Sequence, residues 1–167
     1  MKIRHFLLLV VVVMSSWAVG CAPARSGMEY LNSGGRGEVQ GTMSGVEFCA
    51  VVELSPKGEN VCVEYLAPDA LCGMIFLTNG DKCEVRLGEV GFVCDAKEVV
   101  GFLRPATAFL PQGDANSVQK AEGNTVLTYP ISGTLTLSPT GEPLSVARED
   151  IQMQVVWWQM GDGNFAP

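Results

Sequence analysis

The sequence predicts a mainly β (α+β) fold, in which sequential antiparallel strands are interrupted by one short helical insertion. Three observations favour this class. Apolar and polar residues alternate with a period of two in several short runs, turns rich in Gly and Pro separate those runs, and one longer apolar stretch has helical spacing. About eight to ten strands in largely sequential order would fill one domain over residues 37–160.

The first two strands are expected at residues 46–54 and 60–66, on either side of a turn that contains Pro and Gly. Both runs alternate, as half-buried strands do. One face of the pair is expected to be inner and apolar, and the other carries glutamates and cysteines. The inner residues are Val46, Phe48, Ala50, Val52, Leu54, Val61, Val63 and Tyr65.

A compact passage and a hairpin come next. Residues 67–73 (APDALCG) suit one helical turn that ends at Gly73, where a left-handed backbone would favour glycine. Residues 74–87 (MIFLTNGDKCEVRL) carry two β-rich runs around Asn79-Gly80, which predicts a tight hairpin. Residues 91–95 (GFVCD) suit one more short strand.

The second half of the domain begins with a helical stretch. Residues 97–110 are apolar with helical spacing, and Pro105 is expected to kink or split a helix there. The polar residues 111–123 are expected to form a loop, and four closing strands follow in the runs NTVLTYP, SGTLTLSP, PLSVARE and IQMQVVWWQ. Of the adjacent Trp157 and Trp158, one should face inward and one outward. The outward ring would either cover the sheet edge or mark a partner or membrane contact.

The N-terminus has the three-part plan of an export signal. Lys2 and Arg4 precede an unbroken apolar run over residues 6–14, and small residues then lead to Cys21. The run is shorter than the roughly 20 residues that a membrane-spanning helix needs. Residues 17–20 (WAVG) resemble a lipobox, so we expect cleavage after residue 20 and acylation of Cys21, detectable with palmitate. The alternative is an ordinary signal peptide in which this cysteine is incidental.

We therefore divide the chain into residues 1–20 as signal peptide, 21–36 as lipidated cysteine and flexible tether, 37–160 as the domain, and 161–167 as a tail. This organisation predicts an extracytoplasmic protein, anchored by lipid to a membrane of the cell envelope. Once the two basic residues of the signal are removed, nine basic and 18 acidic side chains leave a net charge of −9. Such a charge repels phosphate backbones, so nucleic acid is not an expected partner.

The histidine content limits the chemistry. The one histidine, His5, lies in the expected signal, so the mature chain has no imidazole for triad catalysis or metal ligation. The carboxylates mostly occupy turns and alternating strand positions, where a solvated face is the simpler interpretation. We expect no enzyme activity, no cofactor and no bound metal.

Five cysteines lie beyond the expected acylation site, at spacings that match no zinc or redox motif. Cys49 and Cys62 lie on the outer faces of the first two expected strands. If the two positions oppose one another, a cross-strand disulfide can form between them, and unpaired thiols are the alternative. Cys83 shares its face with Val85 and Leu87, so we expect a buried free thiol there.

Two stretches of the chain resemble the LolA/LolB-like lipoprotein-localisation superfamily. In residues 63–95, a strand leads into the pattern Y-x-x-P-x-x-L-x-G and an apolar residue, and a hairpin and another strand follow. The second stretch is TLTLSPTGEPLSVAREDIQMQV, with a Pro- and Gly-containing turn between two late strands. The likeness is greatest to the lipoprotein branch of clostridial-type bacteria. The matching positions are Tyr65, Pro68, Leu71, Gly73, Met74, Pro139, Gly141 and Pro143.

This resemblance implies a curved antiparallel half-barrel, whose apolar concave face is covered by a helical lid and binds acyl chains or part of a partner protein. An ordinary packed core is the alternative for the same inward residues. The implied ligand trough comprises Phe48, Val52, Leu54, Val61, Val63, Tyr65, Met74 and Phe76. The implied lid comprises Val99, Val100, Phe102, Leu103, Phe109 and Leu110.

Two functions follow from these expectations. In the first, the chain is a membrane-anchored lipoprotein that holds an acyl chain or another apolar ligand in its half-barrel. In the alternative, it is an accessory or scaffold lipoprotein that binds another exported envelope protein, as germination- or cell-wall-linked relatives in that branch do, without catalysis. The sequence leaves open whether the concave face is hollow or filled.

Overall fold

The computed structural model describes residues 28–111, 113–130 and 133–161, so the expected signal, Cys21 and residues 162–167 lie outside the described part. A first run of strands comprises β1 (Gly35–Met43), β2 (Val46–Leu54), β3 (Val61–Ala67), β4 (Met74–Asn79), β5 (Lys82–Leu87) and β6 (Val90–Asp95). A second run comprises β7 (Ser117–Ala121), β8 (Asn124–Tyr129), β9 (Gly133–Leu137), β10 (Pro143–Ala147) and β11 (Ile151–Met160).

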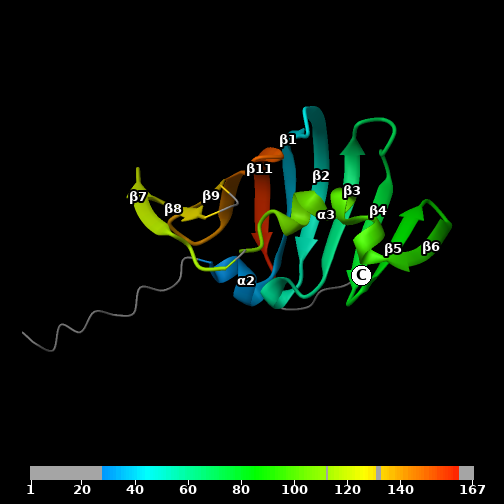
Figure 1. Cartoon of the computed structure of the whole chain (residues 1–167), viewed down its shortest axis with the longest axis horizontal. Coiled ribbons are helices and arrows are strands. Elements are labelled where there is room, and N and C mark those ends of the chain that lie inside the picture. The colour runs from blue at the N-terminus through cyan, green and yellow to red at the C-terminus, as the bar shows by residue number, and fades with distance from the viewer. Residues whose placement is uncertain (1–27, 112, 131–132, 162–167) are drawn as a thin grey trace, which may run out of the picture.

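All 11 strands of the described residues belong to one antiparallel sheet, in the order β6-β5-β4-β3-β2-β1-β11-β10-β9-β8-β7 (Figure 1). The two runs meet where β1 pairs with β11. The sheet curves but does not close, since β6 and β7 lie at its opposite ends. The predicted mainly β class and the curved half-barrel are confirmed.

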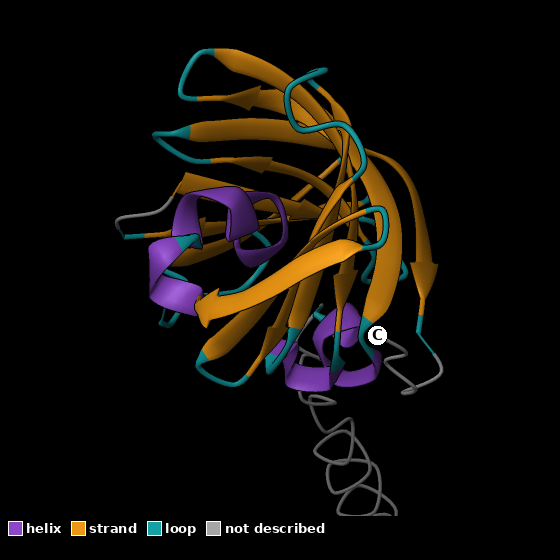
Figure 2. Ribbon diagram, turned by 90° about the vertical axis from the view of Figure 1, so that its right-hand side faces the viewer, coloured by secondary structure: helices purple, strands orange, loops and turns teal. Residues whose placement is uncertain are grey.

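The strand order requires a connection across the sheet. The chain leaves at one end of the sheet, β6, and re-enters at the other end, β7. The connection contains the 3-10 turn η2 (Ala96–Glu98) and helix α3 (Val100–Thr107), and α3 contacts β2, β3 and β11. Figure 2 shows this helical connection within the curve of the strands. The predicted short helical lid is therefore present, and the topology accounts for its position.

Of the kink or split that the sequence predicted at Pro105, the split does not occur. This proline lies within α3, which ends two residues later at Thr107. Because the helix has only eight residues and Pro105 is near its end, a single intrahelical bond, to the carbonyl of Gly101, is lost. The proline ring is fully buried against the core.

The domain begins earlier than Gly37, so the expected tether over residues 21–36 is wrong for its last part. Helix α2 (Glu29–Ser33) precedes β1, and the Tyr30 side chain is fully buried. Gly35 already pairs with Met160 in the sheet. A Cβ on Gly35 would lie 2.7 Å from the Trp158 ring, so the glycine that suggested a flexible linker instead makes room for a tryptophan.

Residues 111–123 also contain more structure than expected. Strand β7 pairs with β8 over five positions, although the sequence there suggested only a loop. Four of its five residues are exposed. An end strand with little core to cover lacks the apolar alternation that identifies a strand.

The remaining local predictions are confirmed. Gly73 has φ of +80°, and a Cβ there would touch only the Leu87 side chain, so its requirement for glycine is conformational. The β4–β5 hairpin forms, with Asn79 paired to Lys82 across a two-residue turn. Trp158 packs inward, whereas Trp157 is exposed and donates a hydrogen bond to Glu38 Oε2 at 3.1 Å. Among the described helices, none is both long and apolar enough to cross a membrane.

Candidate functional site

The inner face of the sheet carries a continuous apolar row that runs across several strands. In this row each residue lies directly opposite the next on neighbouring strands. At about 4.8 Å per strand, the row from β6 to β2 extends roughly 19 Å. Its members are Phe92, Val85, Phe76, Val63 and Val52.

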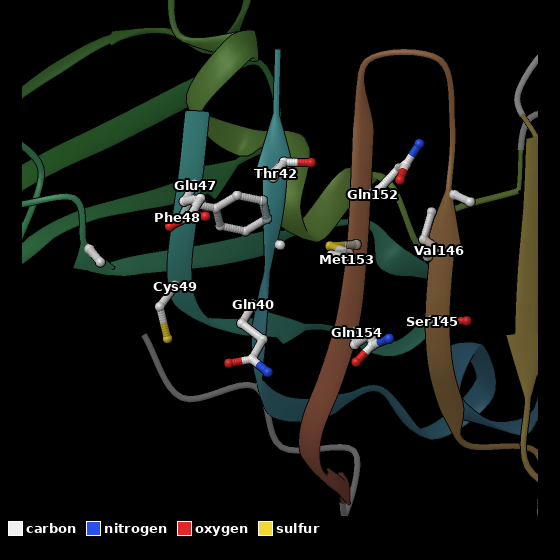
Figure 3. Close-up of a pocket in the computed structure, with 13 residues that line it drawn as sticks. Gln40, Thr42, Glu47, Phe48, Cys49, Ser145, Val146, Gln152, Met153 and Gln154 are labelled. Atoms are coloured by element: carbon white, nitrogen blue, oxygen red, sulfur yellow. The ribbon is translucent and has the colours of Figure 1, made fainter. Parts of the chain in front are cut away.

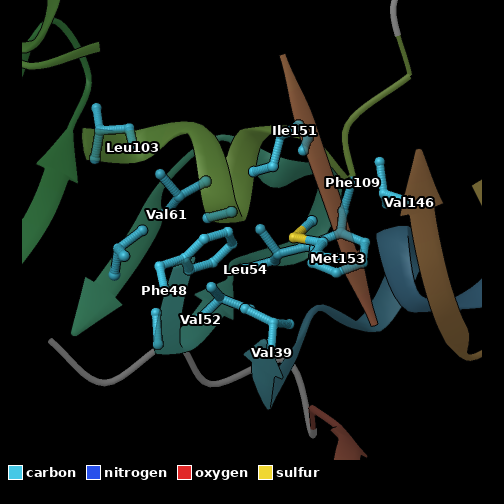
Figure 4. Packing of buried hydrophobic residues seen from close by; sticks show 14 of the residues in the cluster. Val39, Phe48, Val52, Leu54, Val61, Leu103, Phe109, Val146, Ile151 and Met153 are labelled. Carbon is cyan, nitrogen blue, oxygen red and sulfur yellow. The ribbon is translucent and has the colours of Figure 1, made fainter. Parts of the chain in front are cut away.

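The lid covers the middle of this face, and the expected trough residues are packed beneath it (Figure 4). Seven of them are buried, and Met74 is half-buried at the rim. In the conformation described, the trough is therefore filled by side chains and forms part of the core. The buried members are Phe48, Val52, Leu54, Val61, Val63, Tyr65 and Phe76.

The six expected lid residues differ in how far they enter the core. Leu103 and Phe109 are buried, whereas Val99 and Leu110 are partly buried against the core cluster. Val100 and Phe102 remain exposed, although the Phe102 ring stacks on Phe76 with 4.9 Å between ring centroids. The side chains of the C-terminal part of the lid are therefore buried in the core, whereas those of its N-terminal part are more exposed.

Polar side chains of the surrounding domain bind the backbone of the lid. Tyr65 Oη donates to the carbonyl of Phe102 at 3.0 Å, and Tyr30 Oη donates to the carbonyl of Phe109 at 2.6 Å. These tyrosines come from β3 and α2, on two sides of the lid. Burial raises the pKa of Tyr65 to about 12 and that of Tyr30 further still, so both hydroxyls remain protonated donors at neutral pH.

Two arginines complete the lid contacts. Arg104 of α3 pairs with Asp150 in the turn between β10 and β11, with Nε 2.8 Å from Oδ2. The hydrogen bond from Arg104 lowers the pKa of Asp150. Arg148 donates from Nη2 to the carbonyl of Leu110 at 2.8 Å. Apart from one ion pair, the polar contacts that hold the lid are hydrogen bonds from surrounding side chains to carbonyl oxygens of the lid.

Beyond the lid, the inner face continues uncovered. This face is exposed over the β5–β6 hairpin, and the exposed apolar side chains of the adjacent part of α3 border it, with relative exposures between 39% and 76% for the whole set. Phe92 belongs to the apolar row, so this surface is continuous with the core beneath the lid. This surface was not predicted from the sequence, although Leu87, Val90 and Phe92 are apolar and closely spaced around the Gly88-Glu89 turn. We call it the open apolar end, and it comprises Leu87, Val90, Phe92, Val100 and Phe102.

The outer face contains a different feature, a groove of mixed polar and apolar lining, about 720 Å³ in volume, across β10, β11, β1 and β2 (Figure 3). Side-chain amides of Gln40, Gln152 and Gln154 line it, with the hydroxyls of Thr42 and Ser145. Gln40 and Gln154 are directly opposed in the sheet. These neutral amides and hydroxyls can pair with peptide groups, and Glu47 adds a carboxylate to the lining.

The expected disulfide between Cys49 and Cys62 is wrong in this structure. Both are free cysteines, and Cys62 lies opposite Glu53, four residues from Cys49 along β2. Four residues correspond to roughly 13 Å, which is too far for a disulfide. The turn over residues 55–60 sets this pairing, because it places Leu54 opposite Val61 and therefore Glu53 opposite Cys62.

Cys83 is a buried free thiol, as predicted. The cysteine directly opposite it is Cys94, whose Sγ is 3.7 Å from the Cys83 carbonyl oxygen. Leu87, which was expected to share its buried face, instead belongs to the open apolar end. Within residues 28–111, 113–130 and 133–161, no cluster of three or more potential metal-binding side chains was found.

Comparison with known proteins adds information on the fold. No family model matches the sequence, and no curated protein matches it. The structure is similar to that of an uncharacterized conserved protein from Thermus thermophilus, with 16% identity and a TM-score of 0.51 over 81% of this chain and 84% of that one. A LolA superfamily protein from Nitrosomonas europaea is also a structural neighbour, with 12% identity and a TM-score of 0.39 over 86% of this chain and 94% of that one. At such identities the first likeness shows a shared fold, and the second is too distant to add to it.

Proposed function

We propose that this chain is a LolA-like envelope lipoprotein that binds an acyl chain or another apolar ligand on the inner face of its half-barrel. The observation that carries the proposal is the continuity of the apolar row, from exposed Phe92 to buried Val52 beneath the lid. If the apolar residues of the inner face served only as a core, they would be expected to end where the lid ends. Here they continue past the lid onto an exposed surface. An apolar ligand can begin on the open apolar end and advance by displacing the lid.

The energies involved make such a displacement feasible. The three hydrogen bonds to lid carbonyls are each worth about 0.5–1.5 kcal/mol. The partly exposed Arg104–Asp150 pair adds about 0.2–1 kcal/mol. Each buried methylene of a ligand contributes about 0.8 kcal/mol. An acyl chain that buries about eight methylenes would therefore offset these lid contacts, and would also replace the apolar contacts of Leu103 and Phe109.

Native mass spectrometry of the mature chain, purified without detergent, tests this proposal. We expect mass adducts that match acyl-containing lipids and that disappear after organic extraction. Refolded, extracted protein should regain an adduct when dodecanoate is added. A chain that remains free of adducts in both experiments would contradict the proposal.

We also propose that Cys21 is acylated and anchors the domain to a membrane of the cell envelope, as in the clostridial-type lipoprotein branch. The support is the signal-like N-terminus and the lipobox-like residues before the cysteine. Replacement of Cys21 by Ser should leave unprocessed precursor and abolish palmitate labelling. Labelling that persists in this variant would refute the anchor.

A second candidate function, binding of another exported protein, is favoured by the groove on the outer face and the amide side chains that line it. Its amides could pair with a partner's backbone, and neither function requires catalysis. A photo-crosslinker at residue 154 should then capture one stoichiometric envelope protein, and the same probe at exposed Val118 should not. Equal capture at both positions, or none at residue 154, would contradict this function.

A further inference from the structure

Arg148 is a buried arginine beneath the end of the lid. It follows β10, and only 7% of its surface is exposed. Its Nη2 donates to the Leu110 carbonyl at 2.8 Å, but its Nη1 is buried and has no hydrogen-bond partner among the described residues. Lipid-facing or core positions normally exclude such a group, because a buried cation without a partner is costly.

No described carboxylate forms an ion pair with this guanidinium. The nearest candidate, Asp150, forms its ion pair with Arg104, and none of the ion pairs among the described residues includes Arg148. Burial, followed by the positive charge of Arg104, lowers the pKa of Arg148. Tyr129, Asp150 and Tyr30 act in the opposite direction but leave the pKa lowered.

A second unpaired donor lies in the same region. The indole Nε1 of Trp158 is buried and has no partner among the described residues. The Trp158 ring contacts Tyr30 and Phe109, with centroids 6.2 Å and 5.6 Å apart. Phe109 immediately precedes Leu110, whose carbonyl accepts from Arg148. Two buried donors without acceptors therefore border one short segment of the lid.

We propose that Arg148 binds the carboxylate of an acyl ligand, so that the ligand is a fatty acid or a similarly acidic lipid and not a neutral one. This inference rests on the proposed function and specifies its ligand. When the lid is displaced, the Leu110 carbonyl leaves Nη2, and both terminal nitrogens of the guanidinium become available. A carboxylate then accepts two parallel hydrogen bonds, the geometry that arginine favours. The Trp158 N–H is a further donor, and the acyl chain extends from there across β11 and β1 toward the β2 end of the apolar row.

Titration of the full mature chain with dodecanoate, methyl dodecanoate and dodecanol tests the inference without any variant. These probes share a chain length and differ in head group. We expect dodecanoate to bind at least about tenfold more tightly than either neutral probe, because a hydrogen-bonded ion pair is lost with the latter. Equal affinity for all three would overturn the role of Arg148 but leave the apolar site intact. Absence of binding by all three would instead refute the proposed function itself.

Variants then assign the preference to Arg148. Arg148→Gln should reduce the affinity for dodecanoate to that for dodecanol, while Arg148→Lys should retain part of the preference through its charge. Arg36→Gln is the matched control, because Arg36 is an exposed arginine of β1 whose guanidinium is 4.0 Å from Glu64. A full preference for dodecanoate in Arg148→Gln, with its fold verified by circular dichroism, would exclude Arg148 as the head-group site.

Discussion

The covered middle of the inner face and the open apolar end have the same chemistry but different surroundings. Val63 and Phe92 occupy the same cross-strand row, yet Val63 is fully buried and Phe92 is exposed. The difference arises because α3 contacts β2, β3 and β11 but extends little over β5 and β6. Alternation along a strand thus determines which face is apolar, and the path of the connecting helix determines how much of that face is covered.

The largest effect should come from truncating a side chain in the covered region. Phe109→Ala should lower the free energy of unfolding by about 3–5 kcal/mol, because Phe109 is fully buried against Trp158. Phe92→Ala, at the open apolar end, should change it by no more than about 0.5 kcal/mol. Urea denaturation of both variants measures the contrast. Similar losses in the two variants would mean that the open apolar end is not open in solution.

An intermediate effect is expected at the turn that joins these regions. Gly73→Val should destabilise the domain by about 1–3 kcal/mol, because Gly73 has φ of +80° and leads into β4. The control is Gly101→Ala in α3, where a Cβ meets nothing within 4 Å and alanine should stabilise the helix by about 0.5–1 kcal/mol. Thermal unfolding distinguishes the two substitutions. An unchanged melting temperature for Gly73→Val would contradict the conformational role of this glycine.

The smallest effect concerns the ion pair that holds the lid. Because Arg104 lowers the pKa of Asp150 below its ordinary 3.8, the pair stabilises the fold above about pH 4 and is lost as the pH falls through the lowered pKa. Both side chains are partly exposed, so Asp150→Asn should cost only about 0.2–1 kcal/mol at neutral pH. Urea denaturation at pH 7 and pH 3 should show this cost shrinking toward zero in acid. Glu149→Gln, a substitution at the exposed neighbouring residue, is the control. If the loss of stability in Asp150→Asn were the same at both pH values, the Arg104–Asp150 pair could not be its cause.

Much of the fold could be predicted because its signals are local. The alternation of residues 46–54, the Asn79-Gly80 turn and the glycine at position 73 each depend on nearby chain geometry, and each prediction is confirmed. The Cys49–Cys62 pairing failed because the register between two strands depends on the length of the turn, and the turn over residues 55–60 places Cys62 opposite Glu53. Strand β7 was missed because an exposed end strand has no apolar face.

The candidate site was less accessible to sequence reasoning because it depends on tertiary position. The trough residues were identified, but alternation could not show that α3 would bury most of them. Arg148 belongs to a run, PLSVARE, in which an arginine after the last apolar residue suggests a solvated strand end. Only the position of Leu110 above it, 38 residues away in the chain, makes it a buried donor.

The most direct test of the central claim compares two exposed residues of β6 that point to opposite faces. Phe92 is 60% exposed on the inner face, and Val93 is 65% exposed on the outer face. The measurement is the affinity of a fluorescent fatty acid for Phe92→Ser and for Val93→Ser, each relative to the unmodified mature chain. If the inner face is the ligand site, Phe92→Ser should weaken binding about tenfold, from the lost apolar contact, while Val93→Ser leaves it unchanged. Equal effects of the two substitutions, or a larger effect of Val93→Ser, would contradict the account.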